Sequence, residues 1–463
     1  MKFSWVSASA KGPVGLFYFL VKEVFPELRK TVRLAFPIAL GQCGVGLLFV
    51  IDTAMAGRLG EIAIAAAGFS GMLVVLPFLF GLGLCVGVAV LTAQGRGAGR
   101  PEHGATALRH GLVVAGVYGV VSGALIHVCV RAGALACFGQ AEGVVEMAED
   151  FAILMGWSSL PALLFQCLKN NREAIGRPWA ALCWMSAGVV INVVLNFVFM
   201  FGWLGGPKMG LAGAGLATLV ARSVTLVGLA VHPGGQMPRW RDGFQCKWLM
   251  DILKLGIPSA FQWTFETGVF AVAVVLIGRF GKEQQAAHQV AVSLANLAFM
   301  IPVGVSQAAS IRVGEAFGAR SIEAMRRIVA GVLLFAVVFM GSYALVVSTF
   351  RGRVVRLFLT GETSAMTAGF AENFVLIVAA FALFDGLQVV ASGALRGMSD
   401  VRFTSISAFV CYWIISLPVG AFLAFQVGME GIGIWVGLAC AIFAAAFVLN
   451  VRLWWKLGRG RVF

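Results

Sequence analysis

Long apolar stretches separated by short polar gaps make up most of this chain. The stretches are about 20 residues or longer, the length at which an α-helix rising about 1.5 Å per residue crosses a hydrocarbon core about 30 Å thick. The short alternating segments of a transmembrane barrel are missing from the sequence. We therefore predict an all-α integral membrane protein with twelve transmembrane helices, at approximately 34–57, 62–92, 107–130, 148–168, 178–203, 210–231, 252–277, 286–311, 327–350, 367–392, 402–426 and 431–455.

The composition agrees with a protein that lies in the lipid bilayer. Of the 463 residues, 60% are hydrophobic and 12% are charged, whereas a soluble domain carries about 25% charged residues. The 58 glycines suit close helix packing in lipid. A net charge of +14 could indicate nucleic-acid binding, but the basic residues lie in short gaps between apolar stretches. Membrane topology explains them better, and we expect no nucleic-acid partner.

The basic residues are distributed unevenly between the gaps. Most of the 35 lysines and arginines lie in the N-terminal segment, in the gaps after every second apolar stretch, and at the C-terminus. The positive-inside rule then places both termini in the cytoplasm. We expect a multi-pass protein of the inner (plasma) membrane. The short apolar run Pro13–Val21 favours an interfacial helix over a signal peptide, since it is too short to span and lacks a clear cleavage site.

The two halves of the chain repeat each other at a constant offset of 221 residues, the separation of Pro37 and Pro258. The same offset pairs the GRxG turn at Gly57–Gly60 with the GRxG turn at Gly278–Gly281. Paired prolines and paired turns are harder to obtain by composition alone than paired apolar residues. We predict two homologous six-helix lobes of parallel topology around a central cavity, a common plan of secondary transporters.

The repeat and the charge pattern together divide the chain. Residues 1–33 are predicted to be a cytoplasmic N-terminal segment, residues 34–231 the first lobe, residues 232–251 a cytoplasmic linker, and residues 252–463 the second lobe. The sequence contains no GxxxxGK[ST] phosphate-binding loop. Energy for transport is therefore expected from an ion gradient or from a partner.

Acids inside the predicted spans are few, and they are functional candidates because an unpaired charge in lipid is costly. Glu266 lies about midway along its segment, Asp385 somewhat to the cytoplasmic side of the centre, and Asp52 in an outer half. Asp52 could instead cap its helix or reach water. Asp385 could instead belong to a helix-breaking Asp-Gly step.

Two amides accompany the acid of the first lobe. Asn192 and Asn196 are spaced i, i+4, so both side chains face one side of the fifth helix. Asn196 falls at about the depth of Asp52, so the three residues could form one site; the alternative is polar contact between helices. Carboxylate and amide oxygens suit Na⁺, and the same carboxylates can carry protons.

These residues together resemble the multidrug and toxic compound extrusion (MATE) transporters, in particular the NorM-like branch. The resemblance rests on Val50–Gly60 (VIDTAMAGRLG), the asparagine pair in INVVLNF, Glu266, Ala286–Ala291 (AAHQVA) and Asp385. It implies two six-helix lobes around a V-shaped cavity and a transporter, not an enzyme. It also implies secondary active efflux of cationic, amphipathic small-molecule drugs in exchange for Na⁺ or H⁺ by alternating access.

The resemblance also assigns the coupling sites. Glu266 and Asp385 would bind the coupling cation, Na⁺ or H⁺, in the second lobe, and Asp52 with Asn192 and Asn196 would be the counterpart in the first lobe. No other cofactor is implied, and we expect a monomer in the lipid bilayer.

Three other functions remain open from the sequence. A lipid-linked oligosaccharide flippase of related architecture would favour a cavity lined by Arg and Lys, whereas the ionisable residues inside the spans are mostly acids, with Arg222 the exception. A polytopic membrane enzyme would need a catalytic cluster, and the sequence contains neither HExxH nor GxSxG. A channel would be distinguished by steady single-channel current.

Overall fold

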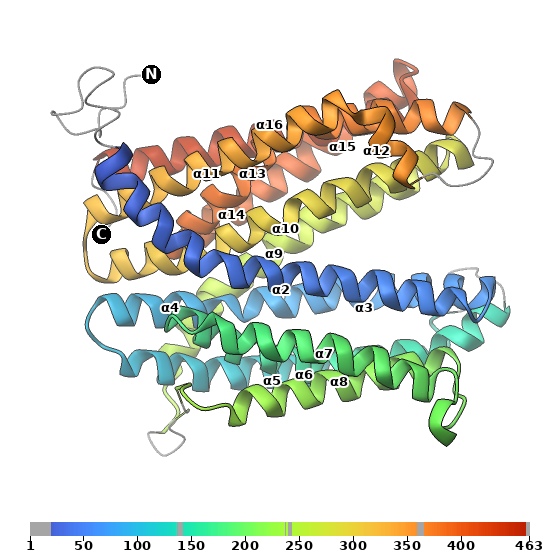
Figure 1. Ribbon diagram of the computed structural model, residues 1–463, viewed down its shortest axis with the longest axis horizontal. Coiled ribbons are helices and arrows are strands. Elements are labelled where there is room, and N and C mark those ends of the chain that lie inside the picture. Colours follow the sequence, from blue (N-terminus) through green and yellow to red (C-terminus); the bar gives the residue numbers. More distant parts are fainter. Residues whose placement is uncertain are drawn as a thin grey trace. The chain divides into compact units, whose positions relative to one another are not determined.

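The computed structural model describes residues 20–135, 137, 142–236, 238, 243–358 and 365–459, and all of its regular structure there is helical (Figure 1). Twelve helices in this part are long and apolar enough to cross a membrane, which confirms the predicted number. Most of the predicted interfacial segment Pro13–Val21 lies outside the described residues.

Six spans come from the first half of the chain. After a π-helical turn η2 (Leu20–Val24), they are formed by α2 (Phe25–Gly57), α3 (Glu61–Leu84) with α4 (Val86–Gly97), α5 (Glu102–Arg131), α6 (Glu142–Ala174), α7 (Pro178–Phe199) and α8 (Leu211–Val231). The second half supplies α9 (Cys246–Gly278), α10 (Lys282–Gly318), α11 (Ile322–Thr349), α13 (Ala365–Gly397), the span of α14 (Val401–Ala408) and α15 (Leu417–Ala421), and α16 (Glu430–Arg459). A short helix α12 (Arg351–Phe358) follows α11.

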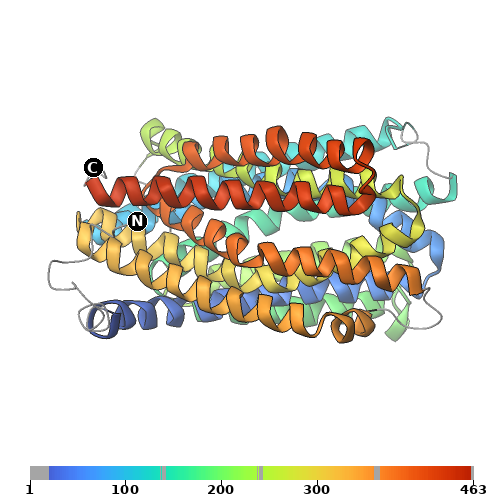
Figure 2. The same cartoon turned by 90° about the horizontal axis from the view of Figure 1, so that it is seen from above.

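The chain forms two compact units, and the divisions between them fall inside helices α2 and α9. One unit is Leu40–Ala260, and the other is Met1–Ala39 with Phe261–Phe463. Within each unit the long helices run nearly parallel or antiparallel to one another (Figures 1 and 2). The lobes predicted as 34–231 and 252–463 remain a prediction. The repeat-paired Pro37 and Pro258 both lie close to a division.

Each unit is built around one helix with several neighbours. In the unit Leu40–Ala260, α6 packs against α3, α5 and α8, and in the other unit α13 packs against α10, α11 and α16. Close packing there uses small residues. Gly83 of α3 meets α9 near its middle, where a Cβ would overlap the backbone of Ala260. Only glycine permits that approach.

The end of α6 differs from the prediction, which closed this span near residue 168. The helix continues through a polar sequence to Ala174, because its polar side chains are buried and satisfied. Lys169 pairs with Glu173 at 3.3 Å, with both side chains 3% exposed, and Asn170 Nδ2 donates to the carbonyl of Cys85 at 2.8 Å. Polar residues at a span terminus therefore did not mark a helix end.

The eleventh span is irregular along its length. Between α14 and α15 the chain forms the π-helical turns η6 (Phe409–Ser416), and η7 (Phe422–Gln426) follows α15. Wide turns of this kind occur frequently at functional sites because they reorient side chains. Here they place Tyr412 in the interior, with 3% of its surface exposed.

Candidate functional site

The first acid cluster lies in the unit Leu40–Ala260, where three predicted site residues come together. Asn196 Nδ2 donates to Asp52 Oδ1 at 2.8 Å and to Asn192 Oδ1 at 3.1 Å. Both asparagines are buried, with 1% or less of their surface exposed. The i, i+4 spacing on α7 puts both amides on one face of the helix, with Asn196 against the carboxylate on α2 and Asn192 against Asn196.

The hydrogen-bonded chain extends to a residue that the sequence did not single out. Asn192 Nδ2 donates to Thr218 Oγ1 at 3.1 Å, and the Thr218 hydroxyl donates to the carbonyl of Ala214 at 2.9 Å. Thr218 therefore fixes the orientation of Asn192, which in turn accepts from Asn196. Threonine inside a span carries no distinctive signal, because its hydroxyl commonly bonds its own helix.

Arg222 supplies a positive charge near the first cluster. Its guanidinium interacts electrostatically with Asp52 and lies over the ring of Phe78, 4.9 Å from its centroid. Its Nη1 donates to Ser158 Oγ at 2.9 Å. Two opposite charges offset part of each other's desolvation cost in a low-dielectric interior. The sequence had noted Arg222 only as the basic exception inside a span.

One acceptor in this cluster has no partner. Asn196 Oδ1 is buried and makes no hydrogen bond to the described residues. It lies beside the Asp52 carboxylate, on the same side chain whose Nδ2 bonds Asp52. Carboxylate and amide oxygens are the donors that hard cations prefer. Asp52, Asn196 and Asn192 could therefore hold a cation such as Na⁺.

The second acid cluster lies in the other unit and centres on Glu266 of α9. Glu266 Oε1 accepts from Gln262 Nε2 at 2.9 Å and from Gln388 Nε2 at 3.5 Å. Gln262 Nε2 also donates to Ser392 Oγ at 2.8 Å. Two glutamines on two helices therefore hold one carboxylate, and the sequence analysis identified neither.

Gln388 is held in turn by the irregular eleventh span. Its Nε2 donates to Tyr412 Oη at 2.8 Å, and Tyr412 Oη donates to Gln388 Oε1 at 3.0 Å. Gln388 and Tyr412 are 2% and 3% exposed. The π-helical turns η6 thus position a hydroxyl that orients the amide next to Glu266. No local sequence signal identifies this contact, because the residues are far apart in the chain.

Asp385 lies on α13, one turn before Gln388. It is half-buried and interacts electrostatically with Glu266. Within the described part of the chain it makes no hydrogen bond. Two neighbouring carboxylates repel each other when both are charged, so such a pair favours binding a cation or a proton.

Arg396 is the positive charge of the second cluster. It is 7% exposed, interacts electrostatically with Glu266, and lies over the Trp263 ring, 5.6 Å from its centroid. Each acid cluster thus includes one arginine. Across the described residues, no group of three or more His, Cys, Asp and Glu side chains could hold a metal ion. A cation at either cluster would need amide or hydroxyl oxygens as well.

Comparison with known proteins identifies similar chains. The model of the MatE family matches residues 37–198 and 258–422. A protein of Bradyrhizobium diazoefficiens named a probable multidrug resistance protein NorM is 35% identical over 449 residues, which cover 92% of this chain and 93% of that protein. A protein of the same name from Mesorhizobium japonicum is 32% identical over 463 residues, covering 97% of each chain.

The fold also has solved counterparts. An outward-facing multidrug resistance MATE family transporter of the MOP superfamily superposes with a TM-score of 0.86 at 19% identity, covering 95% of this chain and 99% of that one. The helical architecture predicted from the hydrophobic pattern is therefore the fold of known transporters.

Proposed function

We propose that this chain, which belongs to the MatE family, is a secondary active multidrug efflux transporter that exports cationic, amphipathic drugs in exchange for Na⁺ or H⁺. The names of its relatives support the drug substrates. The observation that carries the coupling proposal is the pair of acid clusters, one in each compact unit, in which a carboxylate within a spanning helix is held by amide side chains.

The chemistry of coupling follows from the groups around each acid. The carboxylates of Asp52 and Glu266 each have an arginine and hydrogen-bond donors as partners. A Na⁺ ion or a proton arriving at such a carboxylate neutralises it and competes with the arginine and the amide donors. A cationic drug is attracted to the same negative charge. Ion and drug therefore oppose each other at the same acids.

Alternating access is the second part of the proposal. Exchange requires the ion and the drug to shift one two-state equilibrium in opposite directions. We propose that coupling-ion entry from outside favours the state that releases drug, and that drug entry from the cytoplasm favours the reverse. We further propose that both termini are cytoplasmic, which the charge distribution supports, and that the protein is a monomer in the inner membrane.

The flippase alternative is weaker on the same observations. It would use arginines inside the membrane to bind phosphate. Arg222 and Arg396 each interact with an acid, so their charges are already engaged. No observation favours the enzyme or the channel.

The test is ethidium efflux from vesicles containing the purified protein, with a Na⁺ gradient and a pH gradient imposed separately. Asp52→Asn and Glu266→Gln are compared with wild type and with Glu61→Gln, an exposed acid at the start of α3. We expect efflux under one gradient, lost in the two cluster variants and kept in the control. Efflux under neither gradient would refute the transporter proposal, and unchanged efflux in both cluster variants would refute only the ion sites.

A further inference from the structure

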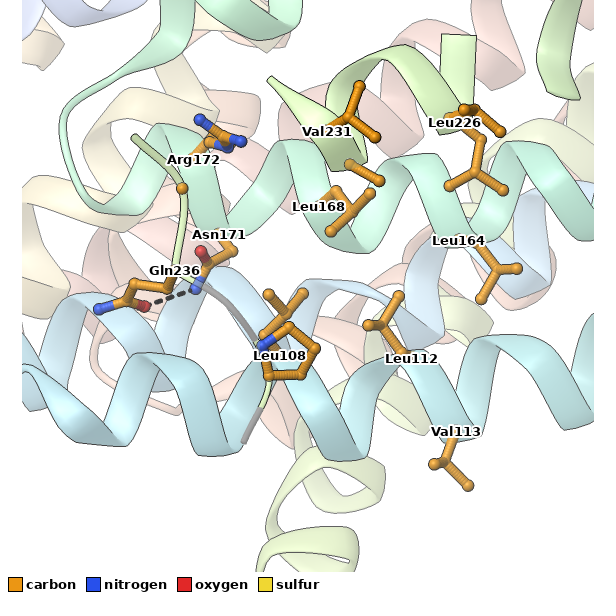
Figure 3. A pocket seen from close by; sticks show the side chains of 14 residues that line it. Leu108, Leu112, Val113, Leu164, Leu168, Asn171, Arg172, Leu226, Val231 and Gln236 are labelled. Carbon is orange, nitrogen blue, oxygen red and sulfur yellow. Dashed lines mark hydrogen bonds between the residues drawn. The ribbon is translucent and has the colours of Figure 1, made fainter. Parts of the chain in front are cut away.

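An apolar cavity lies within the unit Leu40–Ala260, and none of the residues that line it belongs to an acid cluster. It has a volume of about 490 Å³ and is bordered by α5, α6, α8 and the segment that follows α8 (Figure 3). Cavities that hold small molecules are typically about 300–1,000 Å³. Its wall consists mostly of aliphatic side chains, including Leu108, Leu112, Leu164, Leu168 and Leu226.

One side of this cavity is formed by the outward face of α8. Val227 and Val231 line the cavity, and they are 60% and 71% exposed. Exposed aliphatic side chains on a spanning helix face lipid tails, which are as apolar as leucine. The cavity is therefore open to the hydrocarbon of the bilayer. The acyl chain of a lipid is the apolar group that surrounds this opening and can enter it.

Polar side chains gather at one end of the cavity. Figure 3 shows Asn171, Arg172 and Gln236 there, with the leucines beyond them. Asn171 Nδ2 donates to Gln236 Oε1 at 2.9 Å. Arg172, whose surface is 4% exposed, donates through its guanidinium to the carbonyls of Leu229, His232 and Pro233.

The turn after α8 is closed tightly around this guanidinium. A Cβ at Gly235 would overlap Arg172 Cζ, so the approach requires glycine there. The three hydrogen bonds use three of the five N–H donors of the guanidinium. The remaining two donate to nothing else in the described chain.

The positive charge of Arg172 is not neutralised by a neighbouring acid. The charged group that interacts with it is another cation, Arg177, whose Nη1 donates to the carbonyl of Gly234 at 2.8 Å. The nearby Glu173 is already paired with Lys169. Within the described residues neither arginine has an acidic partner. The cavity therefore joins an apolar interior to a net positive end at the terminus of a spanning helix.

We propose that this cavity binds one anionic phospholipid of the bilayer, with an acyl chain among the leucines and the phosphate at Arg172 and Arg177. Arginine binds phosphate through charge-assisted hydrogen bonds, and basic pockets between spanning helices bind anionic headgroups. By the distribution of positive charge, the lipid belongs to the cytoplasmic leaflet. This proposal does not depend on the transported substrate or on the coupling ion.

The test is native mass spectrometry of the detergent-solubilised protein titrated with phosphatidylglycerol or with phosphatidylcholine of the same acyl chains. We expect one retained phosphatidylglycerol, bound about fivefold to tenfold more tightly than phosphatidylcholine. Val227→Phe, at the cavity, is compared with Val224→Phe, which is exposed on the same helix but does not line the cavity. The first should weaken phosphatidylglycerol retention about tenfold and the second should leave it unchanged.

A charge variant tests the headgroup contact. Arg172→Gln should remove the preference for phosphatidylglycerol, and Arg177→Gln, which leaves the contacts of Arg172 to the turn intact, should reduce it. Equal retention of the two phospholipids by wild type would overturn the proposal. So would wild-type retention in Val227→Phe, or retention of oleate without phosphatidylglycerol, which would make the occupant a free fatty acid.

Discussion

Thr218 offers the sharpest test of how the first acid cluster is held. Thr218 and Thr225 are both buried on α8, and each hydroxyl donates to a backbone carbonyl of the preceding turn at 2.9 Å. Of these two, only Thr218 also accepts a hydrogen bond from the described part of the chain, from Asn192 Nδ2 at 3.1 Å. Replacement of each threonine by valine keeps the volume nearly constant and removes the hydroxyl. The difference between the two variants therefore isolates the contact with Asn192.

The size of this difference can be estimated. Both variants lose a bond of the hydroxyl to its own helix. Thr218→Val also leaves the buried Asn192 amide without its acceptor. Hydrogen bonds between membrane helices contribute on average about 0.6 kcal/mol, with a maximum near 1.7 kcal/mol. We expect Thr218→Val to lower the free energy of unfolding by about 1 kcal/mol more than Thr225→Val, a factor of about five in the equilibrium constant.

Two measurements check this expectation. Unfolding by sodium dodecyl sulfate in mixed micelles gives the free energies. Vesicle efflux gives the concentration of coupling ion for half-maximal rate, which should rise about fivefold in Thr218→Val and stay constant in Thr225→Val, because a freed Asn192 no longer orients Asn196. Equal destabilisation and equal ion dependence in the two variants would refute the reasoning that Thr218 positions the cluster.

Two further predictions concern contacts that the sequence did not reveal. Lys169 and Glu173 pair at 3.3 Å with both side chains 3% exposed, so Lys169→Met or Glu173→Leu alone leaves a buried charge unpaired and should lower the free energy of unfolding by about 3–5 kcal/mol. The double variant should be about as stable as wild type. Additive losses in a double-mutant cycle would contradict this prediction. Tyr412→Phe removes both hydrogen bonds to Gln388 and should raise the half-maximal coupling-ion concentration about fivefold, and an unchanged value would exclude a positioning role.

Hydrophobic pattern alone was sufficient for the number and order of the spans, because lipid requires each crossing to be apolar and helical. It was insufficient for the end of α6. There, Lys169 and the residues after it are as polar as a loop, but they are satisfied by partners that are distant in the sequence. Burial of polar groups depends on tertiary contacts, so it cannot be predicted from a short stretch of sequence.

The candidate site was predictable in its acids and in one pair of amides. Carboxylates within a span are recognisable in the sequence because an unpaired charge in lipid is costly. The i, i+4 spacing of Asn192 and Asn196 placed both amides on one face of their helix. The residues that orient them, Thr218 and Tyr412, have ordinary local surroundings. Their role follows from contacts between helices, which the sequence of one helix does not encode.

The division inside α2 has a consequence for how this helix assembles while the chain is being synthesised. The first part of α2 belongs to the unit completed by Phe261–Phe463, and Glu27 pairs there with Arg312, in addition to Lys30 of its own helix. At a translation rate of roughly 5–20 residues per second, that partner emerges tens of seconds after Glu27. During this interval the first part of α2 has been made but lacks its partners from Phe261–Phe463. The first part of α2 must therefore persist unassembled until the second half of the chain has been made.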